Sequence, residues 1–428
     1  MTTGNKAEGT AIRPGIRVVL AIAIGIGLGV LGMLLVSPRP TAPGPRDPEP
    51  PRGLAVADDP TESPLPASRE VALLAGPWGR LRVLSFWLKP RSEFVDTSQC
   101  PTDNPPWEFP GLSPEGLESL LRQSGADETT RQQLRASARF QDGTCLLRPG
   151  PYVIMHLAPP VRAAFYRRLL EVPESPWQEW TIRLDPSDLQ DWVDRSGLPE
   201  PAREAMHRLA YPLGDKVAIS DLPLLCGKAV TTEERRQLVG AWSTNRALMV
   251  KLQLQPGDDV FSIASYWSGG ALRKEILPML ESLAALPQGV VVDILHLLPA
   301  STRSLLNRFP APGDPPRNCF WTAFNFGKDF RDDSLLDARK VQESLDRHYR
   351  EVVNEAPGLG DLVLLTGRSG NVVHAAVQIA DGIVFTKNGE SLMQPWVLMW
   401  LRDVQSIYGK AGETGLRYFR WAAVRAPR

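Results

Sequence analysis

Three Ser-Gly pairs recur at an interval of 72 residues, and this repeat constrains the fold more than any other feature of the sequence. The pairs are Ser124-Gly125, Ser196-Gly197 and Ser268-Gly269. Each pair ends a helical pattern, and a glycine just past a helix is a common stop signal. A period of this length exceeds that of the ordinary solenoid repeats. We therefore expect three tandem α+β units within residues 71–312.

Each unit is expected to contain a strand, two helices, a short apolar segment and a final helix. The strand-like runs of the last two copies are residues 179–184 and 248–254. For the first copy the matching run is residues 81–88, which an insertion carrying Cys100 separates from its helix. Alternation of apolar residues over such short runs favours strands. The sequence thus predicts three small units packed together.

The charge balance and the scatter of metal-binding residue types exclude several classes of function. The chain has 428 residues with 48 Lys+Arg and 48 Asp+Glu, so no net field favours nucleic acid. The four cysteines form no C-x-x-C pair, and the five histidines are scattered. We expect no metal site, no cofactor and no nucleic-acid partner.

The N-terminal part contains one long uncharged run at residues 18–36. Its length suits a membrane-spanning helix, with a cleaved signal peptide as the alternative. The predicted arrangement is a cytoplasmic head at 1–17, a signal anchor at 18–36 and a proline-rich linker at 37–70. Gly25 and Gly29 give a GxxxG pattern that can also support a homodimer.

The repeat also assigns roles to residues that would otherwise look functional. His156 and His296 align with Leu224, which predicts buried packing positions. Cys226 is expected to be a small buried hydrophobe. If the body of the chain is extracytoplasmic, Cys100 and Cys145 can form a disulfide.

A new pattern begins in the C-terminal domain, residues 313–428. Asn318 is a good N-cap, and Cys319 opens the short apolar helix that follows. The free N–H groups and the dipole at a helix start stabilise a thiolate. We therefore expect the pKa of the Cys319 thiol to lie below that of a free cysteine.

His374 lies near the start of a predicted hairpin that turns around residues 380–382. A two-residue Asp-Gly turn places Gly389 opposite His374, whereas a three-residue loop places Asn388 there with Thr386 as the diagonal neighbour. In the second register Asn388 can orient the imidazole, which is the third role in a Cys-His-Asn triad. After the hairpin a last helix is expected over residues 396–408.

A cysteine opening a helix and a histidine beginning a hairpin give this domain a resemblance to the NlpC-type papain-fold cysteine peptidases and amidases. The resemblance covers about residues 310–428, a quarter of the chain. It implies a papain-like α+β domain in which Cys319 is the nucleophile, His374 the base, and Asn388 or Thr386 the orienting residue. The flanking residues differ from the family pattern, with Phe320 directly after the cysteine.

The resemblance implies hydrolysis of amide bonds, often in the cell-wall peptides of bacteria. The first hypothesis is a single-pass protein of the bacterial inner membrane whose periplasmic body is a cysteine hydrolase, with a peptide or peptidoglycan-like substrate. The alternative is an inactive papain-like domain combined with a repeat-built binding module that interacts with an envelope partner.

Overall fold

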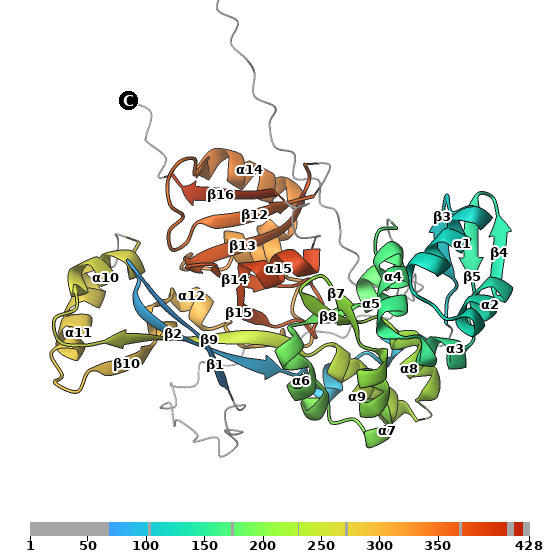
Figure 1. Cartoon of the computed structure of the whole chain (residues 1–428). Helices are drawn as coiled ribbons and strands as arrows, with labels where there is room; N and C mark the ends of the chain where they lie inside the picture. The colour runs from blue at the N-terminus through green and yellow to red at the C-terminus, as the bar shows by residue number, and fades with distance from the viewer. Residues whose placement is uncertain are drawn as a thin grey trace, which may run out of the picture.

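The protein is a mixed α/β molecule with several separate sheets (Figure 1). The computed structural model describes residues 68–101, 104–172, 175–229, 231–269, 273–367, 370–408 and 415–422.

The predicted fold class and localisation need correction at the N-terminus. Among the residues that the structure describes, no helix is long and apolar enough to cross a membrane. The expected span at 18–36 lies outside those residues, as do the head at 1–17 and most of the linker at 37–70. The assignment as a single-pass protein of the bacterial inner membrane, with an anchor that could also dimerise, is therefore withdrawn.

Three successive units, which we call units A, B and C, share the order strand, two helices, one or two strands and two short helical segments, and unit B begins with one additional helix. Unit A contains β3 (Trp107–Pro110), α1 (Pro114–Gln123), α2 (Glu128–Ala136), β4 (Ala138–Gln141), β5 (Thr144–Leu147), α3 (Pro151–His156) and α4 (Pro159–Leu169). Unit B contains α5 (Pro176–Trp180), β6 (Ile182–Leu184), α6 (Leu189–Arg195), α7 (Glu200–Leu209), β7 (Tyr211–Leu213), β8 (Lys216–Ile219), α8 (Leu222–Lys228) and α9 (Thr232–Trp242). Unit C contains β9 (Asn245–Leu254), α10 (Val260–Trp267), α11 (Arg273–Ala284), β10 (Val290–Asp293), the 3-10 turn η4 (Ile294–Leu297) and α12 (Ala300–Arg303).

The three Ser-Gly pairs end the helix that follows the first strand of each unit in the same way. Gly125, Gly197 and Gly269 all adopt positive φ, at 77°, 72° and 52°. Only glycine enters this region without a steric penalty, so each helix stops where the sequence places one. The preceding serine hydroxyls donate to carbonyls three residues back, at 2.9, 2.6 and 3.3 Å. In the first and third helices the hydroxyl thereby pairs a carbonyl at the helix end, and in the second the Val193 carbonyl also accepts from the Ser196 amide.

The strand expected for the first copy lies elsewhere. Residues 81–88 belong to β2 (Gly79–Leu88), which pairs with β9 and with β1 (Arg69–Gly76) in a four-stranded sheet of order β1-β2-β9-β10. The first strand of unit A is instead β3, which pairs with β5 as β6 pairs with β8. The short run of β3 has too few alternating residues to stand out from the insertion before it.

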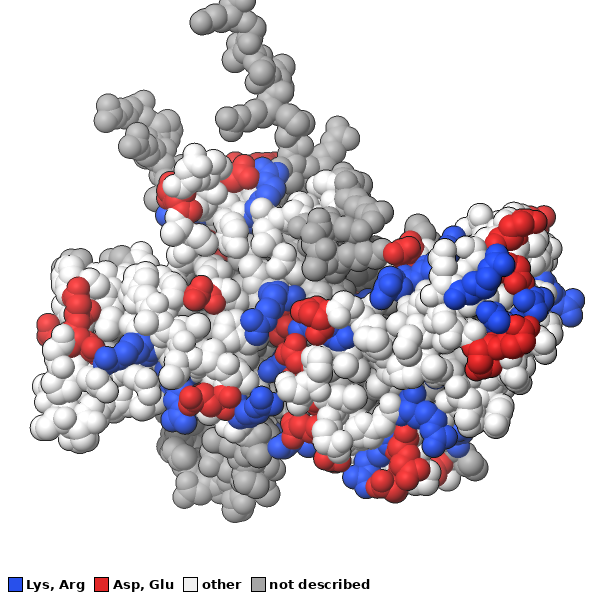
Figure 2. All heavy atoms as spheres, in the orientation of Figure 1, with Lys and Arg blue, Asp and Glu red and all other residues white. Residues whose placement is uncertain are grey.

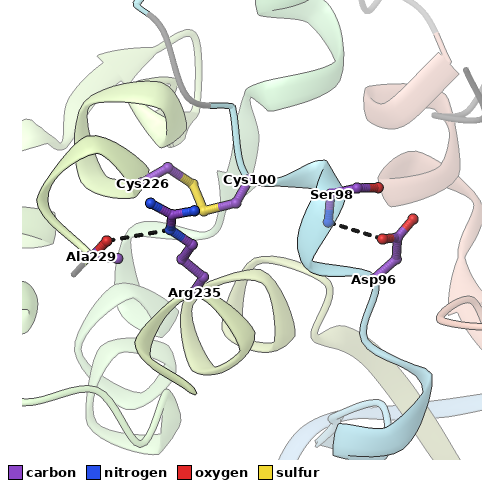
Figure 3. Close-up of a disulfide and its surroundings, with 6 residues drawn as sticks. All are labelled: Asp96, Ser98, Cys100, Cys226, Ala229 and Arg235. Carbon is purple, nitrogen blue, oxygen red and sulfur yellow. Dashed lines mark hydrogen bonds between the residues drawn. A yellow bond between two sulfur atoms is a disulfide. The ribbon is translucent and has the colours of Figure 1, made fainter. Parts of the chain in front are cut away.

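A disulfide joins the insertion before unit A to unit B (Figure 3). It links Cys100 to Cys226 on α8, whereas Cys145 is a free, buried thiol on β5. The expected Cys100–Cys145 bridge is therefore wrong, and so is the assignment of Cys226 as a simple buried hydrophobe. Sequence spacing carried no information on the pairing because the packing of unit B against the insertion decides it.

Two histidines that the repeat assigns to the core are at the surface. His156 and His296 are both exposed, and the His156 ring stacks on that of Tyr152 at 4.1 Å. His156 is the last residue of α3 and His296 lies inside η4, and a buried leucine follows each of them. The prediction of buried packing positions is therefore wrong, because Leu224 is buried whereas both histidines are exposed.

A buried ion pair joins unit A to the start of α8, the helix of unit B that carries Cys226. The guanidinium of Arg162 on α4 donates to the carboxylate of Asp221 at 2.7 Å, and the Tyr166 hydroxyl donates to the same carboxylate. Desolvation raises the pKa of Asp221, while the charge of Arg162 acts in the opposite direction. Removing one partner would leave a buried charge unpaired, so this contact fixes how the two units meet.

The C-terminal domain is built on a six-stranded sheet of order β11-β16-β12-β13-β14-β15. Its strands are β11 (Tyr349–Glu351), β12 (Leu362–Thr366), β13 (Val372–Ala380), β14 (Ile383–Lys387), β15 (Trp396–Trp400) and β16 (Gly415–Trp421). Its helices are α13 (Cys319–Phe324), α14 (Ala338–His348) and α15 (Leu401–Tyr408). The single helix expected over 396–408 is split, because the first five residues are buried and pair with β14.

The two faces of this sheet are covered by different helices. Buried residues of α13 share a cluster with Ala375, Val377 and Phe385. Buried residues of α15 share another cluster with Ala376 and Val384. Because side chains alternate along a strand, α13 and α15 cover opposite faces of β13 and β14. Any group that contacts both helices must therefore lie at a gap in the sheet.

The C-terminal sheet rests on unit C and on the long strands β2 and β9 beneath it (Figure 1). The hydroxyl of Tyr266 on α10 donates to the carbonyl of Ile379 at 2.7 Å. The chain leaving unit C pairs with the start of β15 through backbone bonds between Trp396 and residues 307–308. Acidic and basic side chains alternate over the visible face without a patch of one sign (Figure 2). This pattern matches the balanced composition.

We predict that replacing both Cys100 and Cys226 by Ala lowers the free energy of unfolding by about 4 kcal/mol. The disulfide spans 126 residues, and closing so long a loop removes much of the entropy of the unfolded chain. Urea unfolding without reductant measures the difference. Reductant should shift the midpoint of the wild-type protein and leave that of the double variant unchanged. Equal midpoints for the two proteins without reductant would contradict the stabilising role.

Candidate functional site

Cys319 is held at the start of α13 by a capped helix end. The side chain of Asn318 accepts a hydrogen bond from the amide of Trp321 at 3.0 Å. The sulfur lies within reach of its own amide, that of Phe320 and that of Ala375 on β13, all of which act to lower the thiol pKa. The helix start thus supplies the backbone donors that the sequence predicted.

Burial outweighs these donors. Cys319 is 7% exposed, and desolvation raises the pKa of its thiol to about 11. The expectation of a thiol pKa below that of a free cysteine is therefore wrong for this closed arrangement, because removal from water disfavours the thiolate more than three amides favour it.

The ladder between β13 and β14 ends next to the cysteine. It runs from Ala380↔Ile383 to Val377↔Phe385, although β13 extends back to Val372 and β14 forward to Lys387. The amide of Ala375, which would otherwise face β14, donates to the sulfur of Cys319. The sulfur therefore lies at an opening in the sheet rather than against one closed face.

The hairpin combines the two registers that the sequence left open. Its turn has two residues, Asp381 and Gly382, with Gly382 at a φ of 68°. A bulge between Gln378 and Ala380 then shifts the pairing by one residue. The resulting ladder is the one expected from a three-residue loop. The sequence did not reveal the bulge.

His374 faces α15 and is fully buried. Its Nε2 is 2.8 Å from the hydroxyl oxygen of Thr386, and its ring stacks on that of Tyr408 at 4.0 Å. Nδ1 is without a hydrogen-bond partner among the described residues. Burial lowers the pKa of His374 to about 3, so the ring is neutral near pH 7.

Of the two residues expected to orient His374, Thr386 makes the contact. The Asn388 amide nitrogen instead lies 3.0 Å from the sulfur of Met399, and its carbonyl oxygen is left without a partner in the described structure. Asn388 follows the end of β14, where the strand no longer fixes its direction. The structure thus places the Cys319 sulfur at the amide of Ala375, the residue after His374, and pairs His374 with Thr386. Among the described residues no hydrogen bond joins Cys319 to His374.

Lys387 is a site residue that the sequence analysis missed. It is fully buried, and its Nζ donates to the carbonyls of Gly389 at 2.7 Å and Ser391 at 3.1 Å. Desolvation lowers its pKa to about 7, while the nearby Cys319 acts in the opposite direction. Ile383, Phe385 and Lys387 occupy alternate positions on one buried face. A lysine at a position where the alternation predicts a buried apolar residue was the signal in the sequence that could have identified it.

Comparison of the chain with protein-family models, with curated proteins and with solved structures found no match. The described residues also contain no group of three or more His, Cys, Asp or Glu side chains that could hold a metal ion.

We predict that the protein becomes less stable as the pH is lowered, over a range set by the two pKa values of His374. Its pKa is about 3 in the folded state and about 6.5 when unfolded, so the unfolded chain binds the extra proton between these values. Stability is fully present above about pH 6.5 and decreases as the pH falls toward 3, by up to about 1.4 kcal/mol per unit.

Urea unfolding of the wild type and of a His374→Gln variant at several pH values checks this prediction. The difference in free energy of unfolding between the two proteins should shrink as the pH is lowered. A difference that stays constant across the window would show that His374 is not the titrating group.

Proposed function

We propose that the C-terminal domain hydrolyses amide bonds of peptide substrates, such as bacterial cell-wall peptides, with Cys319 as the nucleophile and His374 as the general base. Thr386 holds the imidazole in place. The substrate class comes from the resemblance to NlpC-type enzymes, and the assignment of roles comes from the geometry of the opening between β13 and β14.

The observation that carries the proposal is the state of the two ring nitrogens of His374. Nε2 is fixed at 2.8 Å from the Thr386 hydroxyl, while Nδ1 has no hydrogen-bond partner in the described structure. A ring that donates its Nε2 proton to Thr386 presents the lone pair of Nδ1 as a proton acceptor. An unpaired buried nitrogen is costly, and a reactive site gives such a nitrogen a use.

The reaction would follow the usual course of a cysteine hydrolase. The Cys319 sulfur, after losing its proton to Nδ1, attacks the carbonyl carbon, and the amine leaves with that proton. Water then cleaves the thioester and regenerates the thiol. The amides of Cys319 and Phe320 lie at the sulfur, where N–H donors can stabilise the developing oxyanion.

The site has to open before it reacts. Cys319 and His374 are buried, and Tyr408 lies flat on the imidazole. At a thiol pKa of about 11 only about one molecule in ten thousand carries a thiolate at pH 7. A bound substrate that displaces Tyr408 would bring Nδ1 within reach of the sulfur. Geometry in a free enzyme is often looser than in its substrate complex.

The same burial supports a second candidate function. A domain whose cysteine and histidine are both closed off and uncharged is also suited to be a non-catalytic module. The three units, which extend from Trp107 to Arg303, would then bind a partner. The two functions differ in a single measurable property, which is the release of new amino groups from a peptide substrate.

We predict that purified protein releases amino groups from isolated peptidoglycan or synthetic cell-wall peptides, and that Cys319→Ala lowers the rate by about a thousandfold or more. Thr386→Val should lower it by about tenfold to a hundredfold because the imidazole loses its fixed orientation. Cys145→Ala, which removes the other free thiol, serves as the matched control and should keep full activity. If wild-type protein releases no more amine than Cys319→Ala, the non-catalytic function is the correct one.

A further inference from the structure

Lys387 is buried on the same side of the sheet as the helix that carries the cysteine. Thr386 reaches His374 on the α15 face, so Lys387, the next residue along β14, points to the α13 face. It pairs with Trp396 across the strands, and its Nζ lies 5.7 Å from the centre of the Trp396 ring. The indole N–H of Trp396 donates to the hydroxyl of Thr322, one turn along α13 from Cys319.

The hydrogen bonds of Lys387 leave one donor unused. An ammonium group has three N–H donors, and the carbonyls of Gly389 and Ser391 take two of them. Among the described residues the third has no acceptor. A fully buried ammonium with a free donor is costly unless an anion forms close by. The Cys319 thiolate is the anion that this site can form. The charge of Lys387 lowers the pKa of Cys319, and the charge of Cys319 raises the pKa of Lys387.

Among the residues that the structure describes, no other charged group competes for this role. Arg317 and Asp333 lie at the outer side of α13, where they contact each other and Trp321. Glu390 is exposed and acts weakly on Lys387. His374 and Tyr408, which approach from β13 and α15, are both neutral near pH 7 because burial lowers the pKa of the first and raises that of the second.

We infer that Lys387 is the cationic partner of Cys319 and stabilises its thiolate, so that the nucleophile of the proposed hydrolase is charged by a buried ammonium on β14. The inference rests on the proposed function for its purpose, although it concerns the thiol alone. Lys387 is a positioning residue here: His374 still carries the proton, and Lys387 keeps the negative charge on the sulfur.

The test is the pH dependence of alkylation of Cys319 by iodoacetamide, followed by mass spectrometry of the peptide that contains it. The rate follows the thiolate fraction. Lys387→Met should raise the apparent pKa of Cys319 by about one unit, which is a tenfold slower reaction at a given pH below the pKa. Lys387→Arg, which keeps the charge, should restore most of the rate. Lys340→Met, at an exposed lysine on α14, is the matched control and should leave the profile unchanged.

A reciprocal measurement protects the test against misfolding of the Met variant. In wild-type protein with ¹³C-labelled lysine, the Lys387 signal should titrate at a higher pH than in Cys319→Ala, because linkage requires each charge to favour the other. Superimposable alkylation profiles for wild type and a folded Lys387→Met, or an unchanged Lys387 titration in Cys319→Ala, would overturn the inference.

The outcomes separate this inference from the proposed function. A shifted thiol pKa without any release of amine would leave Lys387 as the partner of an unreactive cysteine. If amine release depends on Cys319 but the alkylation profile is the same with and without Lys387, the proposed hydrolase is retained and the role of the lysine is rejected.

Discussion

The pairing of β2 with β9 is the interaction on which the arrangement of the whole molecule depends. It runs from Arg80↔Gln253 to Leu88↔Asn245 and is the longest ladder in the described chain. It joins residues that precede unit A to the first strand of unit C. Along the chain, units A and B therefore come between β2 and β9, two neighbouring strands of one sheet. The C-terminal domain shares its main hydrophobic cluster with that sheet. Without this pairing, each unit would contact mainly the unit that precedes or follows it in the chain.

The properties of the candidate site depend on the end of the ladder between β13 and β14 in the C-terminal sheet. Where the ladder between β13 and β14 ends, the backbone amide of Ala375 donates to the sulfur of Cys319. The site collects a thiol, an imidazole and an ammonium, and burial shifts the pKa of each toward its neutral form. Such opposing shifts are common where chemistry is done, and they also occur in closed polar cores. The chemical use of the opening depends on how readily water and substrate enter it.

Local signals in the sequence predicted more than long-range ones. The glycines at the three helix ends and the N-cap at Asn318 act through neighbouring residues, so the sequence alone was enough to place them. The bulge at Ile379 and the disulfide partner of Cys100 depend on packing between distant segments, and no local pattern encodes them. Asn388 was favoured as the orienting residue on chemical grounds, whereas Thr386 makes the contact because it lies within β14.

The disulfide sets a condition on the order of folding. Cys145 follows Cys100 in the chain and precedes Cys226, so it is the first thiol that a growing chain could offer to Cys100. In the folded protein Cys145 is sealed in β5 between β3 and β4. Formation of the small sheet of unit A before oxidation would keep Cys145 from pairing with Cys100. Unit A thus protects the Cys145 thiol, which forms no disulfide. The rate at which the β4–β5 hairpin forms, relative to the rate of oxidation, would then affect the yield of correctly bridged protein.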